Sequence, residues 1–397
     1  MPLLSRLRSA LGRVTTSGVY LAEIDGLRFI AIMMVVAYHI AGYWGIRAGR
    51  TYAAPGPLDK PLESLLHLGF YGVHLFFVIS GFVLGMPFCK HTLAGAPPVN
   101  LGKYFLRRLT RLEPPYVISM LIFFISMPLF GKSSWSELWP HLVASLGYIH
   151  NIVYGCGSLI NNNAWSLEVE VQFYLLVPLI AGALWLPPAI RRSLCVVAIT
   201  FFSLHDLWLP QGFPLTILQF AQYFLTGILL CDLWTTGWRN LPRTSLADLP
   251  GAAAVASFIW VNIAHPGLTA DMANPWLMAA LFYSAIRGRL HSRLLTWGLI
   301  PVIGGMCYSI YLVHARVIAL VIHGALAKLP LFGTFVADYV TVFSVTVPLV
   351  LIVSAVFFLL IEKPCMQPDW PSRLMNWITR GRRQATATVP VRTAHRP

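Results

Sequence analysis

Ten apolar segments divide this chain of 397 residues, and they constrain its fold more than any other feature. A helix needs about 20 apolar residues to cross the roughly 30 Å hydrocarbon core of a bilayer, and each segment is long enough or nearly so. The sequence therefore predicts an all-α, polytopic membrane helix bundle of about ten transmembrane helices. The predicted spans are 26–46, 68–88, 112–130, 164–186, 193–209, 214–234, 249–265, 272–287, 297–323 and 338–361.

The composition agrees with a membrane protein. Hydrophobic residues make up 57% of the chain and charged residues only 11%, whereas soluble domains carry about 25% charged residues. A net charge of +14 would suggest nucleic acid in a soluble protein, but here the basic residues lie mainly between apolar segments, where they set topology. We therefore expect membrane lipid as a partner and no nucleic acid.

The distribution of lysine and arginine predicts the orientation. With the N-terminus in the cytoplasm, most of these residues fall on the cytoplasmic side, as the positive-inside rule requires. Both termini are then cytoplasmic, with a basic N-terminal segment at 1–25, a transmembrane domain at 26–361 and a basic tail at 362–397 that is disordered at its end. The apolar stretch 138–155 is expected to form a short re-entrant or surface helix.

The six cysteines carry no recognisable ligand pattern. None stands in a CxxC or Cys/His spacing, and most lie in apolar runs. We therefore expect neither a disulfide framework nor a metal site, and no permanently bound cofactor.

Three ionisable residues, Asp25, Arg28 and His39, lie in the first apolar run, EIDGLRFIAIMMVVAYHI. Eleven residues are close to three helical turns, so the three share one helix face and His39 lies about 16 Å beyond Arg28. Ionisable groups are costly in hydrocarbon and usually face a partner or a water-filled site. The stripe predicts chemistry inside the membrane, and the alternative is a set of structural ion pairs between helices.

A pair of arginines precedes the third span in the run KYFLRRLTRLEPPY. Arg108 and Arg111 are three apart and share a helix face. Their forked donors match phosphate oxygens, so a nucleotide or coenzyme A is a candidate ligand. They could equally be ordinary topology signals; we expect Glu113 to pair with one of them and Pro114-Pro115 to start the span.

Polar ridges mark the fourth and ninth spans. In NNNAWSLEVEVQFYLLVPL, Ser166, Glu170 and Tyr174 share a face, whereas Glu168 lies about 200° around the helix from Glu170. The alternative is a capped helix start, with Asn163 or Ser166 as the cap. In GMCYSIYLVHARV, Tyr308, Tyr311 and His314 follow one another at intervals of three residues and form a second polar ridge.

Depth suggests which of these residues could meet. His314 and His39 both fall in the outer half of their spans, so two histidines and a carboxylate could form an acid-base site.

In the second span, Gly72, Gly81 and Gly85 predict close helix packing. Ser80 can bond across helices, and His74 is expected to be a buried, hydrogen-bonded histidine.

Taken together, these runs resemble the acyltransferase-3 family of integral-membrane acyltransferases. The resemblance covers most of the chain through five runs in order: IDGLRFIAIMMVVAYH, FYGVHLFFVISGF, FLRRLTRLEPPY, WSLEVEVQFYLLVP and YSIYLVH. The chain departs from the family pattern at His74, where many members have Asp, and we expect no attached extracytoplasmic esterase-like domain. The family's motif positions fall on Arg28, His39, Arg108, Arg111, Trp165, Ser166, Glu170, Tyr311 and His314.

The resemblance implies an O-acyltransferase in the membrane, expected to be a bacterial inner (plasma) membrane. It would move an acyl group, with acetyl the first choice, from cytoplasmic acyl-CoA to a hydroxyl of an extracytoplasmic carbohydrate or glycosylated small molecule. His39 would act as general base, and Glu170 would orient either His39 or the acceptor. Arg28, Arg108 and Arg111 would bind the donor. Substrate contacts would come from Asp25, Trp165, Ser166, Tyr174, Tyr311 and His314.

The sequence leaves several alternatives open. A secondary transporter of a small polar solute would also carry intramembrane Asp, Arg and His, and a scaffold would tolerate loss of His39. Within the enzyme class, a covalent acyl-histidine could replace direct transfer. The sequence does not choose the acceptor, the acyl length or the oligomeric state, although the loops 47–67 and 131–163 are expected to shape acceptor choice.

Overall fold

The computed structural model describes residues 9–13, 20–47, 56–129, 133–328, 333–367 and 370. Across these ranges the protein is helical and contains no strand, which confirms the predicted all-α class. The predicted disordered end of the tail lies outside the described residues, as do residues 48–55 of the 47–67 loop.

Most of the described residues lie in α-helices. These are α2 (Ala22–Arg47), α3 (Asp59–His67), α4 (Gly72–Ala94), α5 (Leu101–Leu129), α6 (Trp135–Leu146), α7 (His150–Tyr154), α8 (Ala164–Ile180), α9 (Pro188–Ser203), α10 (Ala221–Thr236), α11 (Asp248–Ala264), α12 (Leu268–Arg287), α13 (Arg289–Leu295), α14 (Ile300–Gly305), α15 (Cys307–Leu320), α16 (Phe335–Phe357) and α17 (Lys363–Cys365). Short 3-10 helices are η1 (Leu68–Tyr71), η2 (Ala181–Trp185), η3 (His205–Leu207), η4 (Ile217–Gln219), η5 (Trp238–Asn240) and η6 (Ser245–Ala247), and π-helical turns are η7 (Val321–Ala325) and η8 (Phe358–Glu362).

Seven helical stretches in the described residues are long and apolar enough to cross a membrane. They are Ala22–Arg47, Asp59–Ala94, Leu101–Leu129, Ala164–Trp185, Ser245–Ala264, Cys307–Ala325 and Phe335–Cys365. Helices α9, α10 and α12 occupy the three other predicted spans but are not among these seven. The multi-pass character is therefore supported, while the count of ten and the cytoplasmic termini stay predictions.

Several predicted spans differ from the observed helices, and two of these differences affect the site. Helix α5 begins at Leu101 and runs through Pro114 and Pro115, so the prolines do not start it. Because Pro114 has no N–H for the carbonyl of Thr110, that oxygen instead accepts a hydrogen bond from Nε1 of Trp370 at 2.9 Å. The predicted span 297–323 is broken at Met306, between α14 and α15.

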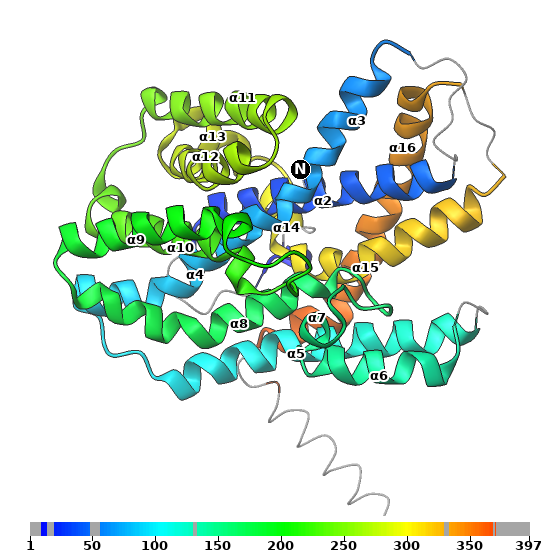
Figure 1. Cartoon of the computed structure of the whole chain (residues 1–397), viewed down its shortest axis with the longest axis horizontal. Coiled ribbons are helices and arrows are strands. Elements are labelled where there is room, and N and C mark those ends of the chain that lie inside the picture. The colour runs from blue at the N-terminus through cyan, green and yellow to red at the C-terminus, as the bar shows by residue number, and fades with distance from the viewer. Residues whose placement is uncertain are drawn as a thin grey trace, which may run out of the picture.

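Helix α2 lies in the middle of the bundle (Figure 1), where it packs against α4, α14, α15 and α16. Its contact with α14 is close: a Cβ on Gly304 would lie 1.7 Å from the carbonyl oxygen of Asp25. The break before α15 thus lets a short glycine-containing helix pack directly on the charged start of α2. The central position brings the polar face of α2 within reach of helices far away in the sequence.

Two short helices replace the predicted single helix at 138–155. Helix α6 begins with a capping box at Ser134 and Glu137, and α7 follows after a tight turn at Tyr148, which has a positive φ of 55°. The backbone N–H of Asn151 donates to the buried carboxylate of Glu168 on α8 at 2.8 Å. This bond joins the 131–163 loop to the fourth predicted span.

The predicted glycine packing is confirmed between α4 and α10. A Cβ on Gly81 would lie 2.1 Å from the carbonyl oxygen of Phe224, whereas Gly42 on α2 has open space around it.

We expect Gly81→Ala to lower the melting temperature in detergent, with a cost of about 1–3 kcal/mol from overpacking. Gly42→Ala should leave it unchanged or raise it, because alanine is the better helix former. Equal melting temperatures for the two variants would contradict the close packing.

Candidate active site

The two histidines that the sequence placed at similar depth lie side by side. Their ring centroids are 5.0 Å apart, and Nε2 of His314 lies 3.4 Å from Nδ1 of His39. His39 comes from α2 and is half-buried, while His314 comes from α15 and is fully buried. The predicted polar ridges of these two helices therefore face each other.

Backbone carbonyls decide where the protons lie on both neutral rings. Nδ1 of His314 is 2.9 Å from the carbonyl oxygens of Ile310 and Tyr311, and Nδ1 of His39 is 2.9 Å from that of Val35. A carbonyl oxygen only accepts, so both Nδ1 atoms carry hydrogen and both Nε2 atoms keep a lone pair. Within the described residues, Nε2 of His39 has no hydrogen-bond partner. A neutral His39 can therefore accept a proton at Nε2.

Residues at the start of α8 hold His314 in place. Nδ2 of Asn163 donates to Nε2 of His314 at 3.3 Å. Asn163 is at the N-cap position, but its side chain does not cap the helix, so the predicted cap is wrong for this residue. The Tyr311 hydroxyl donates to the Asn163 carbonyl at 2.9 Å and lies 2.5 Å from Oγ of Ser166. Ser166 and Tyr311 thus join α8 to α15 beside the histidine pair.

Glu170 lies one turn further along α8 and contacts α4. Its carboxylate accepts a hydrogen bond from Ser80 at 2.6 Å, which confirms that Ser80 bonds across helices. It is also close enough to Arg28 to interact electrostatically. The described residues give Glu170 no contact with His39; the ring of His39 is held by Val35 and His314.

Arg28 is held at the start of α2 by Asp25. Nη1 of Arg28 lies 2.6 Å from Oδ1 of Asp25, and Nη1 of Arg13, a residue outside the predicted span, lies 3.3 Å from the same oxygen. One carboxylate therefore serves two guanidinium groups, and one positive charge is left over. Asp25 therefore orients Arg28 through Oδ1, and its predicted contact with a substrate stays a prediction.

Arg108 and Arg111 lie near this pair. The guanidinium of Arg108 stacks between the rings of Tyr104 and Tyr174, at 5.2 and 5.1 Å. Arg111 is close enough to Arg28, Arg108 and the buried Glu362 to interact electrostatically. The Nε atoms of Arg108 and Arg111 are buried and have no hydrogen-bond partner in the described residues. We call Arg13, Arg28, Arg108 and Arg111 the arginine cluster.

Buried donors without an acceptor are costly, and a catalytic role or a bound water or ion can account for them. The predicted pairing of Glu113 with Arg108 or Arg111 is wrong: no described ion pair joins them, and Glu113 instead interacts with Tyr148. Arg108 and Arg111 thus keep unpartnered Nε–H donors that can bind an anion such as phosphate.

Helices α2 and α8 run alongside this site in opposite senses. On α2, Arg28 belongs to the arginine cluster, and His39 lies eleven residues later in the histidine pair. On α8 the order is reversed: Asn163 is next to the histidine pair, and Tyr174, eleven residues later, is next to Arg108. Ser166 and Glu170 lie between these ends. The site is therefore a polar track of about 16 Å that joins the arginine cluster to the histidine pair.

Two predicted residues lie beside the track. Trp165 stacks on Phe70, with ring centroids 6.2 Å apart, and its carbonyl accepts from Asn151. His74 is buried, as predicted, against the rings of Phe70, Tyr71, Phe77, Phe220 and Tyr223. Its Nδ1 has no hydrogen-bond partner in the described residues, so the predicted hydrogen bond is wrong. An aromatic surrounding of this kind is typical of packing.

Sequence reasoning missed several partners. Glu362, in the π-helical turn η8, accepts hydrogen bonds from the backbone N–H of Ser309 at 3.0 Å and from its hydroxyl at 2.5 Å. Arg13 and Asn163 were missed as site residues because neither lies inside a predicted span. The run of three asparagines at 161–163, directly before an apolar helix, was the available signal for Asn163.

Comparisons with known proteins identify the family. The family model of the acyltransferase domain matches residues 21–362. Acyltransferase MdmB of Streptomyces mycarofaciens is 26% identical over 400 residues, which cover 94% of this chain and 95% of that protein. Peptidoglycan O-acetyltransferase OatA of Listeria monocytogenes is 25% identical over 334 residues, which cover 76% of this chain and 50% of that protein. The chain thus matches half the length of OatA. No solved structure matches the chain.

The match spans every helix that contributes to the polar track, from α2 to the turn η8. It agrees with the resemblance seen in the sequence and with the seven stretches able to cross a membrane. The chain therefore belongs to the acyltransferase-3 family and is a multi-pass membrane acyltransferase.

Proposed function

We propose that this protein transfers an acyl group, acetyl in the first instance, from acyl-CoA to a hydroxyl of a carbohydrate or glycosylated small molecule on the other side of the membrane. The observation that carries the proposal is the polar track, which has anion-binding donors at one end and a base at the other. A secondary transporter is not favoured, because the matched family and relatives are acyltransferases.

The donor would bind at the arginine cluster. Coenzyme A carries phosphate groups at one end and the thioester at the other, and the unpartnered Nε atoms of Arg108 and Arg111 suit the phosphates. The thioester would then lie along α8, past Glu170 and Ser166, toward His39. In the topology that we predict from the sequence, this path leads from the cytoplasm to the outer half of the membrane.

The chemistry would take place at Nε2 of His39. This atom takes the proton of the acceptor hydroxyl, while the hydroxyl oxygen forms a bond to the thioester carbonyl carbon. The carbon–sulfur bond then breaks, and coenzyme A leaves as a thiolate, which receives the proton back from His39. No other co-reactant is needed. Direct transfer is the simplest reaction here, because Nδ1 of His39 is hydrogen-bonded to the carbonyl of Val35 and Nε2 is available to take the proton.

His314 would act as a positioning residue. We expect His314→Ala to lower kcat about 10- to 100-fold with little change in KM, because His39 would lose the partner that holds its ring. The measurement is steady-state acyl transfer at varied donor and acceptor concentrations. A purely structural role would instead lower the amount of folded protein and leave kcat per folded molecule unchanged.

The acceptor class is proposed from the relatives. OatA is named for peptidoglycan, so an envelope glycan is one acceptor to test, and a glycosylated small molecule is the other. The oligomeric state and the membrane of residence, which we expect to be a bacterial inner membrane, stay predictions.

The experiment that tests the proposal uses proteoliposomes with labelled acetyl-CoA on one side and a panel of hydroxylated acceptors on the other. The expected result is label on an acceptor together with free coenzyme A, dependent on the protein. Protein that binds acetyl-CoA and yet labels no acceptor in the panel would contradict a carbohydrate acceptor. Protein that binds neither acetyl-CoA nor longer acyl-CoAs would contradict the donor.

A further inference from the structure

A groove of about 260 Å³ lies between α8, η2, α9 and α10, and none of its lining residues belongs to the polar track. Apolar side chains form most of its walls, among them Leu179, Leu184, Leu194 and Ala198. Leu179 and Leu194 are largely exposed, so in a bilayer they would face lipid. An exposed apolar groove of this kind suits a hydrocarbon chain.

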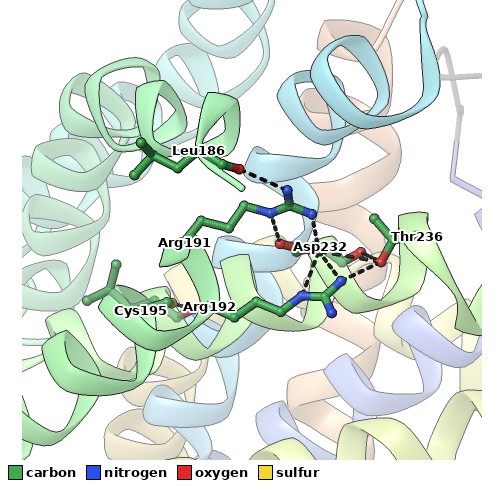
Figure 2. Close-up of polar contacts among 7 residues, drawn as sticks. Leu186, Arg191, Arg192, Cys195, Asp232 and Thr236 are labelled. Carbon is green, nitrogen blue, oxygen red and sulfur yellow. Dashed lines mark hydrogen bonds and ion pairs between the residues drawn. The ribbon is translucent and has the colours of Figure 1, made fainter. Parts of the chain in front are cut away.

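One end of the groove carries a charged cluster, shown in Figure 2. Arg191 and Arg192 on α9 both point to Asp232 on α10, with ion pairs of 2.5 and 2.9 Å. Two guanidinium groups share one carboxylate, so the cluster has one positive charge in excess. All three residues line the groove.

The two arginines differ in how much of their hydrogen-bonding capacity is used. The Arg191 side chain is only 7% exposed, and its three guanidinium nitrogens all donate, to Asp232 and to the carbonyl of Leu186. The Arg192 side chain is 34% exposed, and it donates through Nε and Nη2 to Asp232 and Thr236. Nη1 of Arg192 has no hydrogen-bond partner in the described part of the chain. Arg192 can therefore bind an anion at the open end of the cluster.

We propose that the groove binds an anionic phospholipid, with an acyl chain along its apolar walls and the headgroup phosphate at Nη1 of Arg192. The apolar walls favour a lipid over a free phosphate, and the excess positive charge favours an anionic lipid over a zwitterionic one. The positive-inside rule places Arg191 and Arg192 at the cytoplasmic edge of the membrane, where anionic headgroups lie. Lipid binding in this groove is independent of the acyl-transfer reaction.

The test measures lipid retention by native mass spectrometry of the full chain, released from nanodiscs of phosphatidylglycerol and phosphatidylcholine in equal amounts. Wild-type protein should retain phosphatidylglycerol preferentially, and Arg192→Gln should lower that retention about fivefold. Arg239→Gln is the matched control, since Arg239 is an exposed arginine just after α10 that contacts Trp234 and does not line the groove. The control should retain lipid as wild type does.

A second variant tests the groove without changing charge. Ala198→Phe fills the groove and should abolish the preference for phosphatidylglycerol, with the same circular dichroism and elution volume as wild type. Equal retention of both lipids by wild type would overturn the proposal, as would an unchanged preference in Ala198→Phe. A loss in Arg239→Gln as large as in Arg192→Gln would show only a general charge effect and would also overturn it.

Discussion

His39→Ala is expected to lower acyl transfer by about 10²–10⁴-fold, the range typical of a lost general base. The reason is local: within the described residues, Nε2 of His39 is free, while Nδ1 is held by Val35 and faces His314. No other described side chain combines a free basic nitrogen with this position on the track. The measurement is release of coenzyme A and acylation of the acceptor by protein reconstituted in liposomes.

Two controls accompany this variant. His39→Gln fills the same space without a basic nitrogen and should be as inactive as the alanine variant. His265→Ala removes an exposed histidine between α11 and α12 and should retain full activity. Binding of acetyl-CoA should persist in both His39 variants, because the arginine cluster is untouched. Transfer at wild-type rates in His39→Gln would remove His39 from the mechanism.

Arg108→Ala/Arg111→Ala is expected to weaken acetyl-CoA binding by at least about 100-fold. Each guanidinium would lose charge-assisted hydrogen bonds to phosphate, which contribute roughly 1.5–3 kcal/mol each. Isothermal titration of acetyl-CoA into purified protein in nanodiscs measures the change. The binding loss should appear as a raised KM for the donor, with kcat recovered at high donor concentration.

The matched control removes two positive charges from the same helix. Lys103 and Arg107 lie on α5 beside the pair but are exposed to solvent, so Lys103→Ala/Arg107→Ala should bind acetyl-CoA nearly as wild type does. An equal loss in both double variants would indicate general attraction by a basic surface. An unchanged Kd in Arg108→Ala/Arg111→Ala would place the donor elsewhere.

In the proposed mechanism, the two ends of the site have different roles. The arginine cluster can hold an anion but contains no base, and the histidine pair has a base but no anion-binding group. Residues on α8 connect them, since Asn163 contacts His314 and Tyr174 contacts Arg108. A donor with phosphates at one end and a reactive acyl group at the other matches this division.

Only part of the site could be predicted from the sequence. The residues that share a helix face were identified correctly on α2, α8 and α15, because a period of 3.6 residues fixes them locally. Their partners were not all identified. Glu113 was expected to pair with an arginine but interacts with Tyr148, and the Asn163 contact with His314 was not foreseen. Partner choice depends on helix rotation and packing, which local periodicity does not contain.

The sequence by itself determined the membrane class, the helical content and the family, because these follow from apolar segment length and short ordered motifs. It also determined which polar groups lie inside the bundle, since burying them in hydrocarbon demands partners. Only the tertiary structure decided that His39 meets His314, 275 residues away, and that Arg13 joins Asp25. Contacts between residues so far apart in the sequence depend on how the helices pack around α2. Close approaches, such as that of Gly304 to the backbone of Asp25, fix the position of one helix against another.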